Sequence, residues 1–198
     1  MPASKRRFSM EQVRSACAGL PPPSRRATTT SGTRSAAVLV PLYEETGEAV
    51  VVLIKRPESM PSHRGEIAFP GGIFQPSVDS SLCATALREA HEEVGLVPSL
   101  VEVVAELDTA EVVVSGFLVA PFVGLLESRP ELVPDPREVG GVLEVPLSEL
   151  LGEGVYRQEH WDDGRRTRTI HFFELEGETV WGLTARILAV FLAQLTRP

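Results

Sequence analysis

The sequence is short of cysteines and of long apolar runs, and each shortage excludes a class of protein. Its 198 residues include two cysteines, Cys17 and Cys83, without the repeated spacing of a disulfide framework or a zinc site. No run reaches the roughly 18 apolar residues that a membrane-spanning helix requires. The basic N-terminus is not followed by the apolar core of a targeting sequence. We therefore expect a cytoplasmic protein with no membrane partner.

Positive charge is scarce beyond the first 30 residues. The net charge is -8, from 19 Lys and Arg against 27 Asp and Glu. Residues 1–30 nevertheless carry one acid, Glu11, and six bases, which are Lys5, Arg6, Arg7, Arg14, Arg25 and Arg26. Sequence-independent binding of nucleic acid relies on neutralising phosphates with Lys and Arg, so the acidic body argues against a stable nucleic-acid partner. A phosphate-bearing ligand would need a metal ion or a local basic pocket.

The remaining composition, with 43% hydrophobic and 23% charged residues, is that of a globular protein. The length fits one domain. Residues 9–20 predict a short helix capped by Ser9 and stopped by Gly19, and a Pro- and Ser-rich linker follows. We predict an N-terminal helix and flexible linker over residues 1–34 and a folded domain over residues 35–198.

The domain reads as strands interrupted by a central and a terminal helix. Two apolar runs separated by a Gly-containing turn predict a hairpin, and a Gly-containing turn at Asp162, Asp163 and Gly164 predicts another. The predicted segments are strands in 36–42, 48–55, 101–108 and 111–126, a loop with a helical turn in 127–141, a strand and short helix in 142–151, strands in 155–161 and 165–175, and a helix in 181–195. This order indicates an α+β class with helices packed on a mixed sheet.

Three glutamates crowd one side of a predicted helix over residues 82–94. At about 100° per residue an apolar arc forms from Cys83, Ala86, Leu87, Ala90 and Val94. Glu89, Glu92 and Glu93 share a different arc, where Glu89 and Glu93 repel as an i, i+4 pair. A solvated helix face is the alternative, but a divalent cation would turn this repulsion into attraction, and carboxylate oxygens suit Mg²⁺ or Mn²⁺. We expect Asp79 to cap this helix and Gly95 to end it.

The segment REAHEEVGL, from Arg88 to Leu96, resembles the second half of the Nudix box. The first half departs in spacing, because Gly72 and Asp79 stand with six residues between them where the box has five. The resemblance implies a Nudix-type α/β/α sandwich with a mixed sheet between helices. It also implies a Mg²⁺- or Mn²⁺-dependent diphosphate hydrolase.

The resemblance assigns roles to the residues of the box. Glu89, Glu92 and Glu93 would be metal ligands together with the Gly72 carbonyl, and Arg88 would orient the carboxylates through salt bridges. Members of the family deprotonate the attacking water with a box glutamate or with one from a later loop. Two candidates for that base stay open here, Glu93 and Glu138.

An upstream segment, LIKRPESMPSHRGEIAFPGG, resembles the signature of the coenzyme A (CoA) pyrophosphatase branch of the family. The matching positions are Leu53, Arg56, Gly65, Phe69, Pro70, Gly71 and Gly72, and the departures are Ile54, Pro57 and Pro61. The terminal WGLTARI is also similar to this branch. The resemblance implies CoA or an acyl-CoA as substrate. Because the body of the chain is acidic, we expect the bases Arg56 and Arg64 to reach the phosphates of the substrate, with an exposed charge as the alternative for each. Phe69, Gly71 and Gly72 would face the ligand, with core packing as the other role for Phe69.

Two other functions fit parts of the sequence. Pro61 stands where a second Arg of the CoA signature belongs, which favours an ADP-ribose or nucleoside triphosphate hydrolase as the alternative. A non-catalytic nucleotide sensor with the Nudix fold is the second alternative, although the complete set of glutamates argues against it. A homodimer is common in this superfamily and is left open.

Overall fold

The computed structural model describes residues 6–23, 34–60, 63–112, 116–162, 164 and 167–197. The helices in these residues are α1 (Met10–Cys17), α2 (Leu82–Val94), the 3-10 helix η1 (Pro98–Leu100), α3 (Leu147–Leu150) and α4 (Gly182–Leu195). The strands are β1 (Arg34–Glu45), β2 (Glu48–Lys55), β3 (Ile67–Ala68), β4 (Gly71–Ile73), β5 (Glu102–Glu106), β6 (Ala110–Val112), β7 (Phe117–Leu125), β8 (Gly141–Pro146), β9 (Tyr156–Asp162), β10 (Thr167–Leu175) and β11 (Glu178–Trp181).

A mixed sheet of eight strands forms the centre of the molecule. Its main path is β3-β2-β1-β7-β5, with β4 beside β1, β6 beside β7 and β8 beside β2. Strands β1 and β7 run parallel, and the other pairs are antiparallel. The predicted β1–β2 hairpin is confirmed, with Thr46 and Gly47 at positive φ in its two-residue turn. The apolar run predicted as one strand over 111–126 contains two strands, β6 and β7, and residues 113–115 lie outside the described part.

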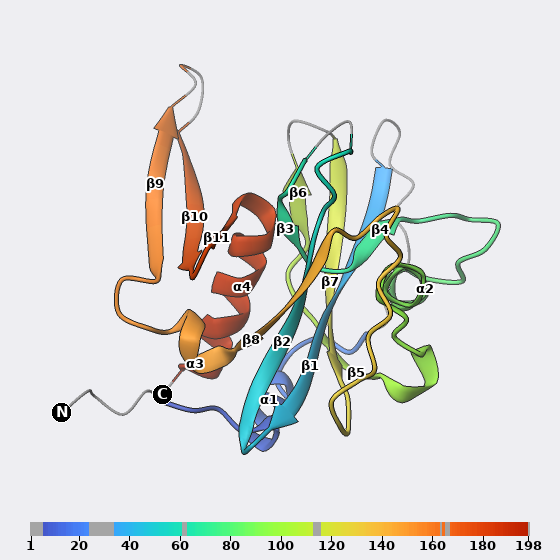
Figure 1. Cartoon of the computed structure of the whole chain (residues 1–198), viewed down its shortest axis with the longest axis horizontal. Helices are drawn as coiled ribbons and strands as arrows, with labels where there is room; N and C mark the ends of the chain where they lie inside the picture. The colour runs from blue at the N-terminus through green and yellow to red at the C-terminus, as the bar shows by residue number, and fades with distance from the viewer. Residues whose placement is uncertain are drawn as a thin grey trace.

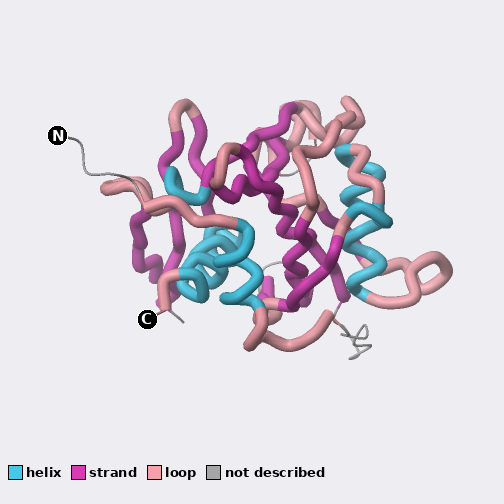
Figure 2. The backbone as a smooth tube through the Cα atoms, turned by 90° about the horizontal axis from the view of Figure 1, so that it is seen from below, coloured by secondary structure: helices cyan, strands magenta, loops and turns pink. Residues whose placement is uncertain are grey.

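Helices cover both faces of this sheet (Figures 1 and 2). Alternate residues of the strands point to opposite sides, so Leu39 and Val52 join α2 in one apolar cluster. Val40 and Val51 join α1 and α4 in the other cluster. The predicted α/β/α sandwich with a mixed sheet is therefore confirmed.

A second sheet, β11-β10-β9, packs on α4 (Figure 1). The predicted hairpin of β9 and β10 is confirmed, although Asp163 in its turn lies outside the described residues. The third strand, β11, was not predicted. It follows the turn at Glu176 and Gly177, where Gly177 has φ +77°.

Helix α1 is packed against the domain although the sequence predicts a separate N-terminal segment. Ser9 caps it, since its side chain accepts from the Gln12 N–H while the Gln12 side chain accepts from the Ser9 N–H. Phe8, Val13 and Cys17 are buried in the cluster that contains α4. Residues 6–23 thus share the core of the domain, and most of the predicted linker, residues 24–33, lies outside the described part.

None of the helices in the described residues is long and apolar enough to cross a membrane.

Candidate functional site

Helix α2 begins and ends at residues that fix it beside the Gly71–Gly72 strand. Gly95 ends it in the left-handed conformation with φ 74°, as predicted. The prediction that Asp79 caps its start is wrong. Ser81, the residue directly before the helix, accepts the hydrogen bond from the Ala84 N–H at 3.1 Å and is the N-cap.

Asp79 instead anchors a buried polar network. Its carboxylate is 2% exposed and accepts two hydrogen bonds from Arg88, from Nε at 2.8 Å and from the terminal nitrogen Nη2 at 3.0 Å. It also accepts from the Thr85 hydroxyl at 3.0 Å and from the Gln75 N–H at 2.9 Å. These donors hold the pKa of Asp79 below its ordinary value, with the Arg88 hydrogen bond as the largest cause. The loop before α2 is thereby tied to the middle of the helix.

Arg88 connects this network to two of the helix glutamates. Its Nη1 lies 2.8 Å from Glu89 Oε1 and 2.9 Å from Glu92 Oε2. The salt-bridging contacts predicted for Arg88 are present, and Asp79 adds a third carboxylate. One guanidinium therefore offsets part of the repulsion among the carboxylates and orients two of them.

The Gly71–Gly72 backbone lies directly against the other side of the cluster. Glu93 Oε2 accepts a hydrogen bond from the Gly71 N–H at 2.9 Å. A Cβ at Gly72 would lie 2.4 Å from the Glu89 carboxyl carbon, so only glycine leaves room for that carboxylate. Both glycines belong to β4, which pairs with Ala37 and Val38 of β1. The sheet thus holds β4 where Glu89 and Glu93 approach it.

The glutamates differ in exposure, and burial raises the pKa of two of them. Glu93 is 4% exposed, and this burial raises its pKa to about 8. The charges of Glu89 and Glu138 also raise the pKa, whereas the hydrogen bond from the Gly71 N–H and the charge of Arg56 lower it. Burial also raises the pKa of Glu89, and Glu92 and Glu138 contribute. The Glu92 side chain is 52% exposed. The fold therefore holds partly desolvated carboxylates close to one another at an electrostatic cost.

The three glutamates offer oxygen ligands of the kind that a divalent cation takes. Within the described ranges, no three His, Cys, Asp or Glu side chains converge as a ready-made metal cluster. Glu92 is exposed and held by Arg88, whereas Glu93 is hydrogen-bonded to β4, and Glu89, which Arg88 also holds, lies against that strand. Exchange of the Arg88 contact for a cation would add Glu92 to the donor set. Carboxylates that raise one another's pKa gain most from such a charge.

Glu138 and Arg56 also lie near the cluster. Glu138 is exposed on the loop after β7, and its charge contributes to the raised pKa of both Glu89 and Glu93. That loop is tied to α2 by the Asp135 N–H, which donates to the Glu93 carbonyl at 2.9 Å. Arg56 follows β2, and its charge acts on Glu93 in the opposite sense. Its Nε is buried and has no hydrogen-bond partner among the described residues.

The two remaining predicted substrate-binding residues, Arg64 and Phe69, contact other parts of the chain. Arg64 is exposed, and its Nε donates to the Met60 carbonyl at 2.7 Å. Phe69 is 4% exposed and packs in the cluster of α1 and α4, on the sheet face opposite α2. Of the two roles expected for Phe69, its position favours core packing. Pro61 lies outside the described residues.

Sequence reasoning missed Thr85, a polar residue that is fully buried at the start of α2. Its hydroxyl donates to Asp79, and it lies three residues before Arg88. The available signal was a threonine next to the apolar arc of a helix that contains an arginine one turn later. That signal is weak, because Thr also occurs in helices without such a partner.

Comparison with known proteins places this chain in one family. The NUDIX domain model matches residues 33–169. The Nudix hydrolase NudL of Photorhabdus laumondii, itself uncharacterized, is 39% identical over 171 residues, which cover 85% of this chain and 88% of that protein. Nudix hydrolase 22, chloroplastic, of Arabidopsis thaliana is 41% identical over 164 residues, which cover 78% of this chain and about half, 53%, of the plant protein.

Solved structures agree at the level of the fold. A MutT/nudix family protein from Enterococcus faecalis superposes with a TM-score of 0.53 at 17% identity, covering 85% of this chain and 64% of the other. RenU, a Nudix hydrolase from M. smegmatis, gives 0.51 at 20% identity, covering 64% of this chain and 81% of the other. With the match of the domain model and the identity to NudL, these likenesses lead to one conclusion: the chain belongs to the Nudix hydrolase family.

Proposed function

We propose that the chain is a Mg²⁺-dependent pyrophosphohydrolase that cleaves the diphosphate bond of CoA or an acyl-CoA. The products would be 3′,5′-ADP and 4′-phosphopantetheine or its acyl form. The observation that carries the proposal is the contact of Glu89 and Glu93 with the Gly71–Gly72 backbone, beside Arg56 and Glu138. A cluster of carboxylates next to an open glycine backbone suits a cation and an anionic substrate together.

The proposed ligands of Mg²⁺ or Mn²⁺ are Glu89, Glu92 and Glu93, with the Gly72 carbonyl. When bound, such an ion would neutralise charge on the diphosphate oxygens and lower the pKa of a water molecule. The chain itself has to orient the carboxylates and accept the proton of the attacking water. Arg88 serves the first task through its contacts with Glu89 and Glu92. Glu93 and Glu138 both remain candidates for the second.

Arg56 supports a substrate that carries several phosphates. The chain has a net charge of -8, so an anionic substrate is attracted by local basic groups rather than by the whole molecule. The Arg56 Nε, buried without a partner in the described part of the chain, is a donor that a phosphate oxygen would satisfy. Arg64 is exposed on the following loop, where we propose that it contacts a more distant phosphate. The segment upstream of the box resembles the signature of CoA pyrophosphatases, which supports CoA as the substrate whose phosphates Arg56 and Arg64 would bind.

A substrate panel tests this proposal. The protein would be incubated with Mg²⁺ and CoA, ADP-ribose, NADH or 8-oxo-dGTP, and the products separated by chromatography. ADP-ribose belongs in the panel because the Nudix domain of Shewanella oneidensis NrtR was crystallised with it. Fastest turnover of CoA supports the proposal. Faster turnover of another compound would move the assignment to that substrate, and binding without turnover would indicate a sensor.

Substitution of Arg56 tests its proposed contact with the substrate phosphates. Arg56→Gln should lower kcat/KM for CoA by about 10- to 100-fold, the range for a lost hydrogen bond to a charged group. Arg129→Gln is the matched control, because Arg129 pairs with Glu45 and Glu144 elsewhere in the fold. Equal effects of the two substitutions would contradict the role of Arg56.

A cytoplasmic location stays a prediction.

A further inference from the structure

The small sheet leaves one long strand edge open. In the order β11-β10-β9, strand β9 has a neighbour on one side only among the described strands, and Figure 1 shows it at the outer margin of the molecule. All seven residues from Tyr156 to Asp162 pair with β10 without a register shift, so no bulge disturbs the strand. The strand contains neither proline nor lysine, and its charged side chains, Arg157, Glu159 and Asp162, are of both signs, so they repel only a partner strand whose charges do not match. A straight edge about 23 Å long is therefore available for pairing.

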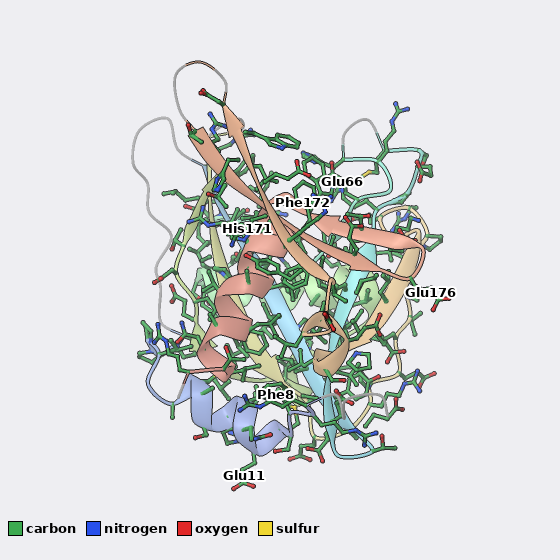
Figure 3. All side chains as sticks on the ribbon, turned by 90° about the vertical axis from the view of Figure 1, so that its left-hand side faces the viewer. Phe8, Glu11, Glu66, His171, Phe172 and Glu176 are labelled. Carbon is green, nitrogen blue, oxygen red and sulfur yellow. The ribbon has the colours of Figure 1, made fainter. Side chains whose placement is uncertain are left out.

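Aromatic side chains gather on the same sheet. Among the described residues, the exposed aromatics are Trp161 at 50%, Trp181 at 39% and Tyr156 at 39%, and all three belong to this sheet. Phe172 lies between the two tryptophans, 6.3 Å from Trp161 and opposite Trp181. Arg157 stacks over the Phe172 ring at 4.0 Å. Figure 3 shows the molecule from this side, with Phe172 and His171 labelled. Trp, Tyr and Arg are enriched in protein interfaces.

The sequence of β9 is complementary to itself in one register. Antiparallel pairing of two copies about an axis through Gln158 places Arg157 opposite the partner's Glu159, and the reverse pair occurs on the other side of the axis. It also places Tyr156 opposite the partner's His160. An axis through either neighbouring residue would put Arg157 opposite Arg157 or Glu159 opposite Glu159. Of these three axes, only the one at Gln158 joins opposite charges. Within one chain Arg157 already contacts Glu159, and it binds Glu174 at 2.8 Å, so the pairing across the axis would be added to these contacts or exchanged for them.

We propose that β9 is the dimerisation edge of this protein and that its occupant is β9 of a second copy. The pairing extends each three-stranded sheet into a six-stranded antiparallel sheet across the two-fold axis. The Glu89 and Glu93 site is on α2, beyond α4 and the large sheet from this edge (Figure 1). Dimerisation through β9 thus leaves the candidate active site open in both copies.

Charge reversal on β9 gives a direct test by sedimentation velocity across a concentration series. Arg157→Glu and Glu159→Arg each place like charges opposite one another twice in the homodimer, and each also breaks the Arg157–Glu159 ion pair within the chain. The mixture of the two variants, which restores only the pairs between chains, separates the two effects. Each should raise the dissociation constant about tenfold or more relative to the unaltered chain. An equimolar mixture of the two variants restores both opposite-charge pairs and should form heterodimers. The double variant Arg157→Glu/Glu159→Arg should also recover dimerisation.

A matched control and the activity of each variant make the outcome decisive. Glu176→Arg changes an exposed acid in the turn between β10 and β11 and should leave the dissociation constant unchanged. Activity per chain should be unchanged in every variant, because none of these residues lies at the candidate active site. A monomer at all concentrations would overturn the proposal. A dissociation constant that is unchanged by both charge reversals would overturn it equally. So would a mixture of the two variants that dimerises as weakly as each variant alone.

Discussion

Two adjacent glycines meet different neighbours, so the same substitution should have different effects at each. A Cβ at Gly71 would lie 2.4 Å from the Ala37 carbonyl oxygen, which belongs to the backbone of β1. A Cβ at Gly72 would meet the end of the Glu89 side chain, which is able to move. The first clash threatens the fold, and the second threatens the placement of a proposed metal ligand.

Gly71→Ala should lower the free energy of unfolding by about 1 to 3 kcal/mol, as overpacking does. Gly72→Ala should change it less, but should lower kcat by about 10²-fold because the Glu89 carboxylate is displaced. Urea unfolding and steady-state kinetics on the best substrate measure both quantities. If Gly72→Ala keeps full activity, Glu89 does not act from its observed position.

The Asp79–Arg88 pair should dominate the stability of the loop before α2. Asp79→Asn removes the charge that partners Arg88 in a nearly buried pair, while Arg88 retains Glu89 and Glu92. We expect a loss of about 3 kcal/mol, at the low end for a broken buried pair. Asp135→Asn is the control, since its partner Arg137 is 83% exposed, and it should have little effect in the same urea titration. Similar losses in both variants would contradict this ranking.

The same pair predicts a pH dependence. Arg88 lowers the pKa of Asp79 in the folded state below its ordinary value of 3.8. The contribution to stability is therefore fully present above pH 3.8 and is lost as the pH falls through the lower folded value. The difference in unfolding free energy between the unaltered chain and Asp79→Asn should shrink in that acidic range. A difference that stays constant or grows there would refute this assignment.

Residues whose role depends on local spacing were predictable, and those that depend on loop geometry were not. Gly95 was predicted because a glycine after a helix favours the left-handed conformation. Asp79 was predicted as a cap because an acid near a helix start commonly serves as one. The loop instead turns its carboxylate towards Arg88, nine residues later, and leaves Ser81 as the cap. That choice depends on the path of residues 72–81, which spacing alone does not determine.

At the scale of elements, helix α1 shows the clearest difference between the sequence prediction and the structure. Its capping signal was readable, but its docking was not, because contacts with a partner as distant in sequence as α4 leave no local pattern. Strand β11 escaped notice for a related reason. Its four residues are too few to show a period, and its assignment depends on pairing with β10. The two hairpins were predictable because turn and register are local.

Phe8 should contribute to the stability of the whole domain through α1. It is 1% exposed, and its backbone carbonyl accepts from the Ala49 N–H of β2. Phe8→Ala should cost about 3 to 5 kcal/mol of unfolding free energy by leaving a cavity. Ser15→Ala, an exposed position of the same helix, should stay within about 0.5 kcal/mol. Thermal and urea unfolding would measure both, and a mild effect of Phe8→Ala would mean that α1 is dispensable.

In the whole molecule, the candidate active site and the proposed dimerisation edge lie on different sides. The carboxylates belong to α2, which covers one face of the large sheet, and the open strand β9 lies on the far side of α4 (Figure 1). The sequence predicted the sandwich because apolar runs and helical periods are strong signals in it. It did not predict the second sheet as a separate layer, since the same β9–β10 hairpin could have joined the central sheet.

Hydrolysis of CoA by the unaltered protein and by Glu92→Gln tests the central claim most directly. With Mg²⁺ present, the unaltered chain should release 3′,5′-ADP and 4′-phosphopantetheine in equal amounts. Glu92→Gln should lose most of this activity while its unfolding transition is unchanged, because Glu92 is exposed and Gln has nearly the same shape. Equal activity of the two proteins, or no release of either product by the unaltered chain, would contradict the account.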